Sequence, residues 1–114
     1  MPKTKKNPNP SPPRRKRDQV TRKAPPLGKV IRGSLIERYL PCGKPGCHCH
    51  QKGEKGHGPH YYLVFNEGKK MRHVYIPQES REVVKRYVRN YLDLWEAILQ
   101  VSALNLELLK RREL

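Results

Sequence analysis

All three cysteines and four of the five histidines of the chain lie between residues 41 and 60. Thiolate sulfur and imidazole nitrogen are the ligands that structural zinc takes in a tetrahedral site, and such a site needs four of them close to one point. We therefore predict a zinc site, with Zn²⁺ as the cofactor, whose ligands are Cys42, Cys47, Cys49 and His57.

The ligand spacing, Cys-x4-Cys-x-Cys-x7-His, departs from the paired spacing of common zinc fingers. Glycines throughout this segment favour the tight bends that a chain needs around an ion. Because His48 and His50 alternate with Cys49, their side chains are expected to point away from the site, and His60 leads into a β-type run. His57 is the preferred fourth ligand, and the other three histidines stay as alternatives.

Three other interpretations of the cysteines compete with a metal site. A disulfide would leave one of the three cysteines unpaired, and unliganded core cysteines fit poorly in so polar and Gly-rich a segment. A catalytic thiol beside a histidine would use one cysteine and leave two without a role. The metal site explains all three at once.

The charge of the chain indicates a polyanionic partner. Its 114 residues contain 25 Lys and Arg against 10 Asp and Glu, a formal net charge of +15. Cationic side chains release counterions when they pair with phosphates, so nucleic acid is the expected partner, and an acidic membrane surface is the alternative. With no apolar run of about 18 residues and no apolar segment of a secretory signal at the start, we expect a cytoplasmic protein associated with a nucleoid or a ribonucleoprotein.

Residues 1–32 are predicted to form a disordered, basic, Pro-rich arm. They hold seven of the eleven prolines and eleven Lys and Arg but a single acid, Asp18, so they offer little apolar surface to offset the entropy of ordering. A solubility tail or a targeting signal is the alternative. The residues of the arm expected to contact phosphates are Arg14, Arg15, Lys16, Arg17, Arg22 and Lys23.

Residues 33–77 are predicted to form the zinc-knuckle β domain. Alternating residues over 34–40 indicate a strand that runs into the first ligand. The runs 61–65 and 72–76 are rich in aromatic and β-branched residues and indicate a hairpin with its loop at 66–69, which Pro77 ends. The fold class is therefore α+β, with a small zinc-stapled three-stranded antiparallel sheet followed by a long C-terminal helix.

Residues 78–114 contain no Gly or Pro and are predicted to form that long amphipathic helix. Two apolar stripes run along it, and the small sheet is too short to cover both. We expect residues 84–109 to bind a second copy or a protein partner, with Asn105 able to set the register of a dimer. A helical hairpin that breaks near residues 102–105 is the alternative. A helix lying on a membrane is disfavoured because Glu and Asp are interspersed on the polar face, so no membrane partner is expected.

A string of motifs in this chain resembles a family of short prokaryotic proteins that carry a domain of unknown function. The resemblance covers roughly residues 33–110, leaves the basic arm outside, and implies that Cys42, Cys47, Cys49 and His57 act as one unit, rather than His48, His50 or His60. It implies no activity. The motifs are Gly33-Ser34-Leu35, Tyr39, Cys42-Gly43-Lys44, Cys47, Cys49, His57-Gly58-Pro59, Tyr61-Tyr62-Leu63 and Tyr75-Ile76-Pro77 before a long helix.

These features predict a non-enzymatic, zinc-stabilised module that binds DNA or RNA. Beyond the arm, the basic residues expected to bind nucleic acid are Lys44, Lys52, Lys55, Lys69, Lys70 and Arg72, and tyrosines beside them suit base stacking, although several are expected in the core. The alternative is an accessory subunit of a ribonucleoprotein or of mobile-element machinery that docks through its C-terminal helix. An enzyme is disfavoured because Glu54 is the only acid in the knuckle and four protein ligands leave zinc no open position.

Overall fold

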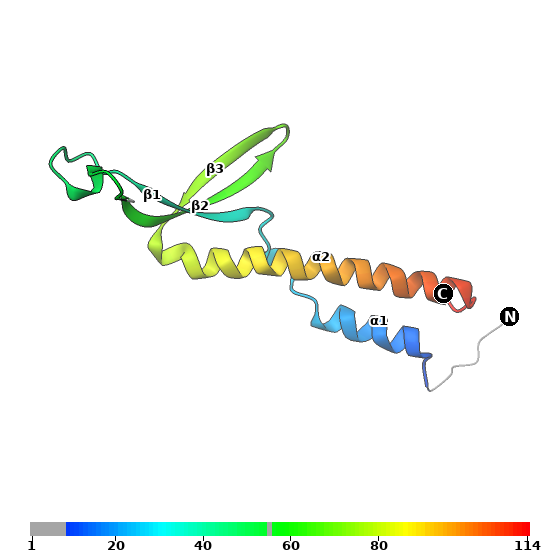
Figure 1. Ribbon diagram of the computed structural model, residues 1–114. Helices are drawn as coiled ribbons and strands as arrows, with labels where there is room; N and C mark the ends of the chain where they lie inside the picture. The colour runs from blue at the N-terminus through cyan, green and yellow to red at the C-terminus, as the bar shows by residue number, and fades with distance from the viewer. Residues whose placement is uncertain (1–8, 55) are drawn as a thin grey trace. The chain divides into compact units, whose positions relative to one another are not determined.

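The computed structural model describes residues 9–54 and 56–114, apart from the side chain of Cys49. Its helices and strands are α1 (Pro12–Lys23), β1 (Ser34–Leu40), β2 (His57–Glu67), β3 (Lys70–Ile76) and α2 (Arg81–Lys110), with short 3-10 turns at Leu27–Lys29, His48–His50 and Gln78–Ser80 (Figure 1). The chain divides into two compact units. The sheet unit is residues 30–89; the helical unit comprises the described residues up to Lys29 together with Asn90–Leu114.

The sheet unit contains a three-stranded antiparallel sheet in the order β1-β2-β3. Leu63 of β2 pairs with Leu35 on one side and with Val74 on the other. A tight turn at Gly68, whose φ is +63°, joins β2 to β3. The predicted three-stranded antiparallel sheet followed by a long helix is confirmed, and both strands of the hairpin are longer than the predicted runs.

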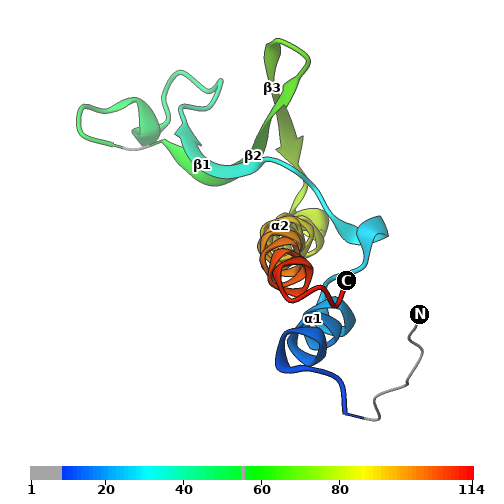
Figure 2. The ribbon, with the colours of Figure 1, turned by 90° about the vertical axis from the view of Figure 1, so that its right-hand side faces the viewer.

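The start of α2 lies against one face of this sheet (Figures 1 and 2). The Arg81 guanidinium lies 4.5 Å from the centroid of the Tyr61 ring, and the Lys85 ammonium lies 5.3 Å from it. Arg81 also donates a hydrogen bond to the Pro59 carbonyl at 3.4 Å. On the same face Ile76 is only 2% exposed, so this face carries the small core of the sheet unit.

The predicted disordered arm is corrected over Pro12–Lys23, which form helix α1. Two prolines begin this helix, where a missing N–H costs nothing, and Arg, Lys and Gln are good helix formers. The prediction considered only the composition of the segment itself, but hydrogen bonds from Arg14 and Arg17 tie α1 to the C-terminal part of the chain. Residues 1–8 of the predicted arm lie outside the described residues.

In the helical unit, α1 runs antiparallel beside the C-terminal part of α2 (Figures 1 and 2). Arg17 donates a hydrogen bond to the side-chain oxygen of Asn105 at 3.1 Å, and Arg14 donates one to the Glu113 carbonyl. Asn105, for which a role in the register of a dimer stays a prediction, thus accepts a hydrogen bond from a helix of its own chain. Pro13 and Leu108 are the buried side chains among the described residues of this unit.

Helix α2 is continuous from Arg81 to Lys110, so the alternative of a helical hairpin is wrong. Arg112 adopts a left-handed φ of 57°, and the Glu113 N–H donates to the Leu108 carbonyl at 2.8 Å, which closes the helix C-terminus. In the part of the chain that the structure describes, neither helix has an apolar stretch long enough to cross a membrane.

Replacing Leu108 by alanine is expected to lower the free energy of unfolding by about 2–5 kcal/mol, because a fully buried leucine leaves a cavity. Urea unfolding followed by far-UV circular dichroism would measure the change. The matched control is Leu27→Ala in the same unit, where the side chain is 77% exposed and the expected cost is about 0.5 kcal/mol. Equal losses for the two variants would contradict this packing.

Candidate metal centre

The pairing of β1 with β2 brings the two ends of the knuckle, defined as residues 41–56, together. Leu40 at the end of β1 pairs with His57 at the start of β2. Cys42 follows Leu40 by two residues, so its side chain emerges close to His57. Backbone hydrogen bonds then turn the loop back: the Cys47 N–H donates to the Lys44 carbonyl at 3.2 Å, and the His50 N–H donates to the Cys47 carbonyl at 3.1 Å.

Two glycines next to the site allow this close approach. Gly56 has a φ of +93°, and a Cβ there would lie 2.7 Å from the Leu40 carbonyl carbon. Gly58 has a φ of +151°, and a Cβ there would lie 2.7 Å from the Arg38 carbonyl oxygen. Any larger side chain at either position would push β2 away from β1, and so move His57 away from the cysteines.

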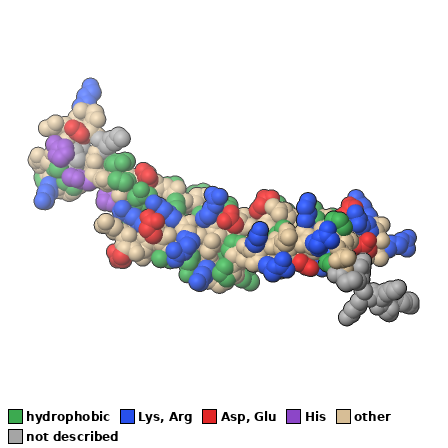
Figure 3. Space-filling view, turned by 90° about the horizontal axis from the view of Figure 1, so that it is seen from below, with side chains coloured by type: hydrophobic (Ala, Val, Ile, Leu, Met, Phe, Trp, Pro, Cys, Tyr) green, Lys and Arg blue, Asp and Glu red, His purple; other side chains and the backbone are tan. Residues whose placement is uncertain are grey.

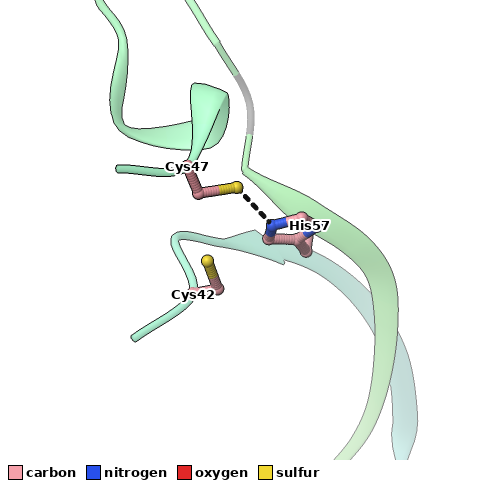
Figure 4. Close-up of side chains that lie close together, drawn as sticks. All are labelled: Cys42, Cys47 and His57. Carbon is pink, nitrogen blue, oxygen red and sulfur yellow. Dashed lines mark hydrogen bonds between the residues drawn. The ribbon is translucent and has the colours of Figure 1, made fainter. Parts of the chain in front are cut away.

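Cys42, Cys47 and His57 form a cluster whose ligand atoms all lie within 4.8 Å of one another (Figure 4). Cys47 Sγ and His57 Nε2 lie 3.2 Å apart. Tetrahedral zinc, with bonds of about 2.3 Å to sulfur and 2.0 Å to nitrogen, would place neighbouring ligand atoms roughly 3.5–3.8 Å apart. Small side-chain movements would therefore bring these three atoms onto one ion, and the three residues can bind a metal.

The remaining predicted ligand, Cys49, lies in the 3-10 turn His48–His50, and its side chain is outside the described part of the structure. Among the described residues, the metal-binding cluster includes His57 and not the alternative histidines. His50 Nε2 lies 2.7 Å from the Cys42 carbonyl oxygen, and His60 lies beside Tyr75 on the sheet. His48 is the nearest alternative, with Nδ1 3.9 Å from Cys47 Sγ.

The basic residues of the predicted arm divide into two groups on α1. Arg14 and Arg17 are half-buried and bond to Glu113 and Asn105 within the helical unit, so they are structural. The exposed group is Arg15, Lys16, Arg22 and Lys23.

The basic residues predicted on the knuckle and the hairpin belong to the sheet unit, and those described there are exposed. Arg72 forms an ion pair with Glu67 at 3.0 Å. Lys55 lies outside the described residues. The other exposed members are Lys44, Lys52, Lys69 and Lys70.

The sequence pattern presents the tyrosines of the hairpin as one set, but the structure divides them between the two faces of the sheet. Tyr61 meets α2, whereas Tyr62 pairs with Tyr75 on the opposite face. Of these, Tyr61 and Tyr62 are half-buried and Tyr75 is 49% exposed. The alternation of side chains along a strand was the signal for this division, but it does not tell which face a helix covers.

Comparison with known families places the chain in one of them. Residues 12–86, more than half of the chain, match DUF6788, a domain of unknown function. The chain belongs to this family. The match begins at the first residue of α1, so part of the predicted arm is inside the domain, which corrects the expectation that the arm lies outside it. Comparisons with curated proteins and with solved structures gave no match.

Substituting His57 by alanine is expected to reduce bound divalent metal from about one equivalent per chain to background, because the remaining donors no longer surround an ion. Element-resolved mass spectrometry of the purified protein would measure this, and Cys47→Ser should have the same effect. His60→Ala is the control, since His60 lies outside the cluster, and it should retain the metal. Full occupancy in His57→Ala would show that another histidine is the ligand.

Proposed function

We propose that this protein is a non-enzymatic, zinc-stabilised module that binds nucleic acid. The observation that carries the proposal is the excess of 25 Lys and Arg over 10 Asp and Glu, together with the exposure of many of these cations. In Figure 3, Lys and Arg side chains (blue) cover more of the visible surface than Asp and Glu (red). Such a surface attracts a phosphate backbone and releases its counterions on binding.

Zinc is the metal that the donor set favours. Two thiolates and an imidazole suit a borderline-soft, tetrahedral ion, and Cys49 would complete a Cys₃His set. The knuckle needs such a constraint, because none of the described side chains in residues 41–54 is buried. Residues without a core stay ordered when a metal links them, and in this class of site the binding free energy is also folding free energy.

The same donor set argues for a structural rather than a catalytic ion. A hydrolytic zinc site keeps one position open for water and places a base beside it. Four protein ligands would fill the coordination sphere, and Glu54 is the one acid of the knuckle. We therefore assign the ion the role of holding the knuckle, with its exposed Lys44 and Lys52, against the sheet.

Neutralising the four exposed cations of α1 tests the charge argument without removing the helix. Arg15→Gln, Lys16→Gln, Arg22→Gln and Lys23→Gln together should weaken binding to a nucleic-acid oligonucleotide and make it less salt-dependent. The logarithmic salt slope should become shallower by about 0.7–0.9 for each phosphate that the variant no longer neutralises. Fluorescence anisotropy at several salt concentrations would measure both quantities.

A variant with Lys and Arg exchanged at the same four positions is the control, since it keeps every charge. It should bind like the parent protein. If the parent binds no nucleic acid at low salt, the proposed function is wrong; if the neutralised variant keeps the parent slope, α1 takes no part in binding.

A second candidate function is that of an accessory subunit that docks through α2. The observation that favours it is an apolar stripe with the 3-4 spacing of a coiled coil, whose members are 50–56% exposed. A groove of about 550 Å³ beside it, lined in part by Ile98 and Val101, adds apolar surface. The stripe consists of Leu92, Trp95, Leu99, Leu106 and Leu109.

Introducing charge into this stripe tests the docking candidate. If α2 binds a second copy, Leu99→Glu with Leu106→Glu should convert a dimer to a monomer in size-exclusion chromatography with light scattering, because the seam would bury two carboxylates. Arg86→Glu with Gln100→Glu, at exposed positions on another side of the helix, is the control. A monomeric parent protein would remove the second copy as the partner.

A further inference from the structure

We propose that the face of the sheet opposite α2 stacks the bases of a single-stranded nucleic acid; the proposal rests on the proposed function and names its substrate class. We call this surface the open face. It is formed by alternate residues of all three strands: Ile36, Arg38, His60, Tyr62, Met71, His73 and Tyr75.

The register of the sheet defines this face. Tyr62 lies between Ile36 of β1 and Tyr75 of β3, and His60 pairs with Arg38. Because successive side chains in a strand point to opposite sides, Tyr62 and Tyr75 point away from the side on which Tyr61 meets Arg81. Within the sheet unit, α2 therefore covers the other face.

The rings on the open face lie next to one another. The Tyr62 and Tyr75 centroids are 5.7 Å apart with an interplanar angle of 70°, and the His60 and Tyr75 centroids are 6.4 Å apart. The Arg38 guanidinium lies 5.5 Å from the centroid of Tyr62. Aromatic rings and a guanidinium plane side by side are the groups on which unpaired bases stack.

Part of this face is accessible, whereas His60 and Tyr62 are half-buried. Tyr75 is 49% exposed, Met71 is 65% exposed, and Arg38 and His73 are exposed. On the opposite face Ile76 is 2% exposed, and Val74 of the same strand is 48% exposed. The rings of Tyr75 and His73 are therefore the ones that the open face presents to a ligand.

The acids of the sheet lie on one of its two faces, together with the basic residues Lys70 and Arg72. Both acids of the strands, Glu37 and Glu67, lie on the face toward α2: Glu37 accepts a hydrogen bond from the Tyr61 hydroxyl, and Glu67 pairs with Arg72. The open face contains no acid, but it contains Arg38 and two histidines. A polyanionic strand would meet no carboxylate among the side chains of this face.

Single-stranded ligands fit this surface better than duplexes do. In a duplex the bases are stacked on each other and their ring faces are hidden, so tyrosines on a flat sheet cannot reach them. The exposed lysine of the hairpin turn, Lys69, would contact the phosphates of a strand lying across the sheet. RNA and DNA share this chemistry, and the experiment distinguishes them.

The experiment compares binding of the full-length, metal-loaded protein to three probes of one sequence. These are a single-stranded RNA of about 12 nucleotides, the equivalent DNA strand, and the DNA duplex, measured by fluorescence anisotropy. Tyr75→Ala should weaken binding of at least one single strand by about 5-fold or more, the effect of removing one stacked base, and leave the duplex affinity unchanged. The strand that responds identifies RNA, DNA or both.

Two further variants separate stacking from folding. Tyr75→Phe keeps the ring and should bind like the parent, whereas Tyr75→Leu keeps apolar bulk without a π face and should bind like Tyr75→Ala. Val74→Ala, in the same strand on the opposite face, is the control and should leave all three affinities unchanged. Metal content and circular dichroism would check that each variant is folded.

The outcomes distinguish this proposal from the function on which it rests. If the parent binds none of the probes, both are wrong. The parent protein could bind while Tyr75→Leu weakens the affinity for single strands and for the duplex equally, or changes neither affinity. In either case the open face is not a stacking surface, and only the proposal that exposed cations bind nucleic acid remains.

Discussion

The antiparallel pairing of β1 with β2 is the constraint on which the rest of the sheet unit depends. It places His57 beside Leu40, and so closes the knuckle into a loop with Cys42 and Cys47 near His57. The same register decides which side chains share a face of the sheet. One interaction therefore positions the metal ligands and also separates Tyr61, which meets α2, from Tyr62, which does not.

Each unit has few buried side chains. Among the described strands and α2, the buried apolar side chains are Ile76 of β3 in the sheet unit and Leu108 of α2 in the helical unit. Burying one such side chain contributes about 1.5–3 kcal/mol, whereas structural zinc contributes about 10–16 kcal/mol in small zinc-finger peptides. None of the described side chains of the knuckle is buried. A bound metal would therefore contribute more to the folding free energy of this segment than side-chain packing does. In the helical unit, hydrogen bonds from Arg14 to the Glu113 carbonyl and from Arg17 to Asn105 add to this packing.

The metal-binding cluster and the sheet could be predicted because their signals are local. Cysteines and histidines gather within a single short segment, and alternating apolar residues mark the strands. Helix α1 could not, since its stability comes from α2, at the other end of the chain. Asn105 shows the same limit: its polar side chain in an apolar stripe did not indicate that it accepts a hydrogen bond from Arg17 of the same chain.

The sequence by itself determined the elements of the sheet unit, the residue types of the candidate metal site and the positive charge, because each follows from composition or from a period along the chain. Only the tertiary structure decided which groups meet. It brought Cys42, Cys47 and His57 within 4.8 Å, set α1 against α2, and turned the acids of the sheet toward one face. Such choices depend on contacts between distant segments, and no local pattern records them.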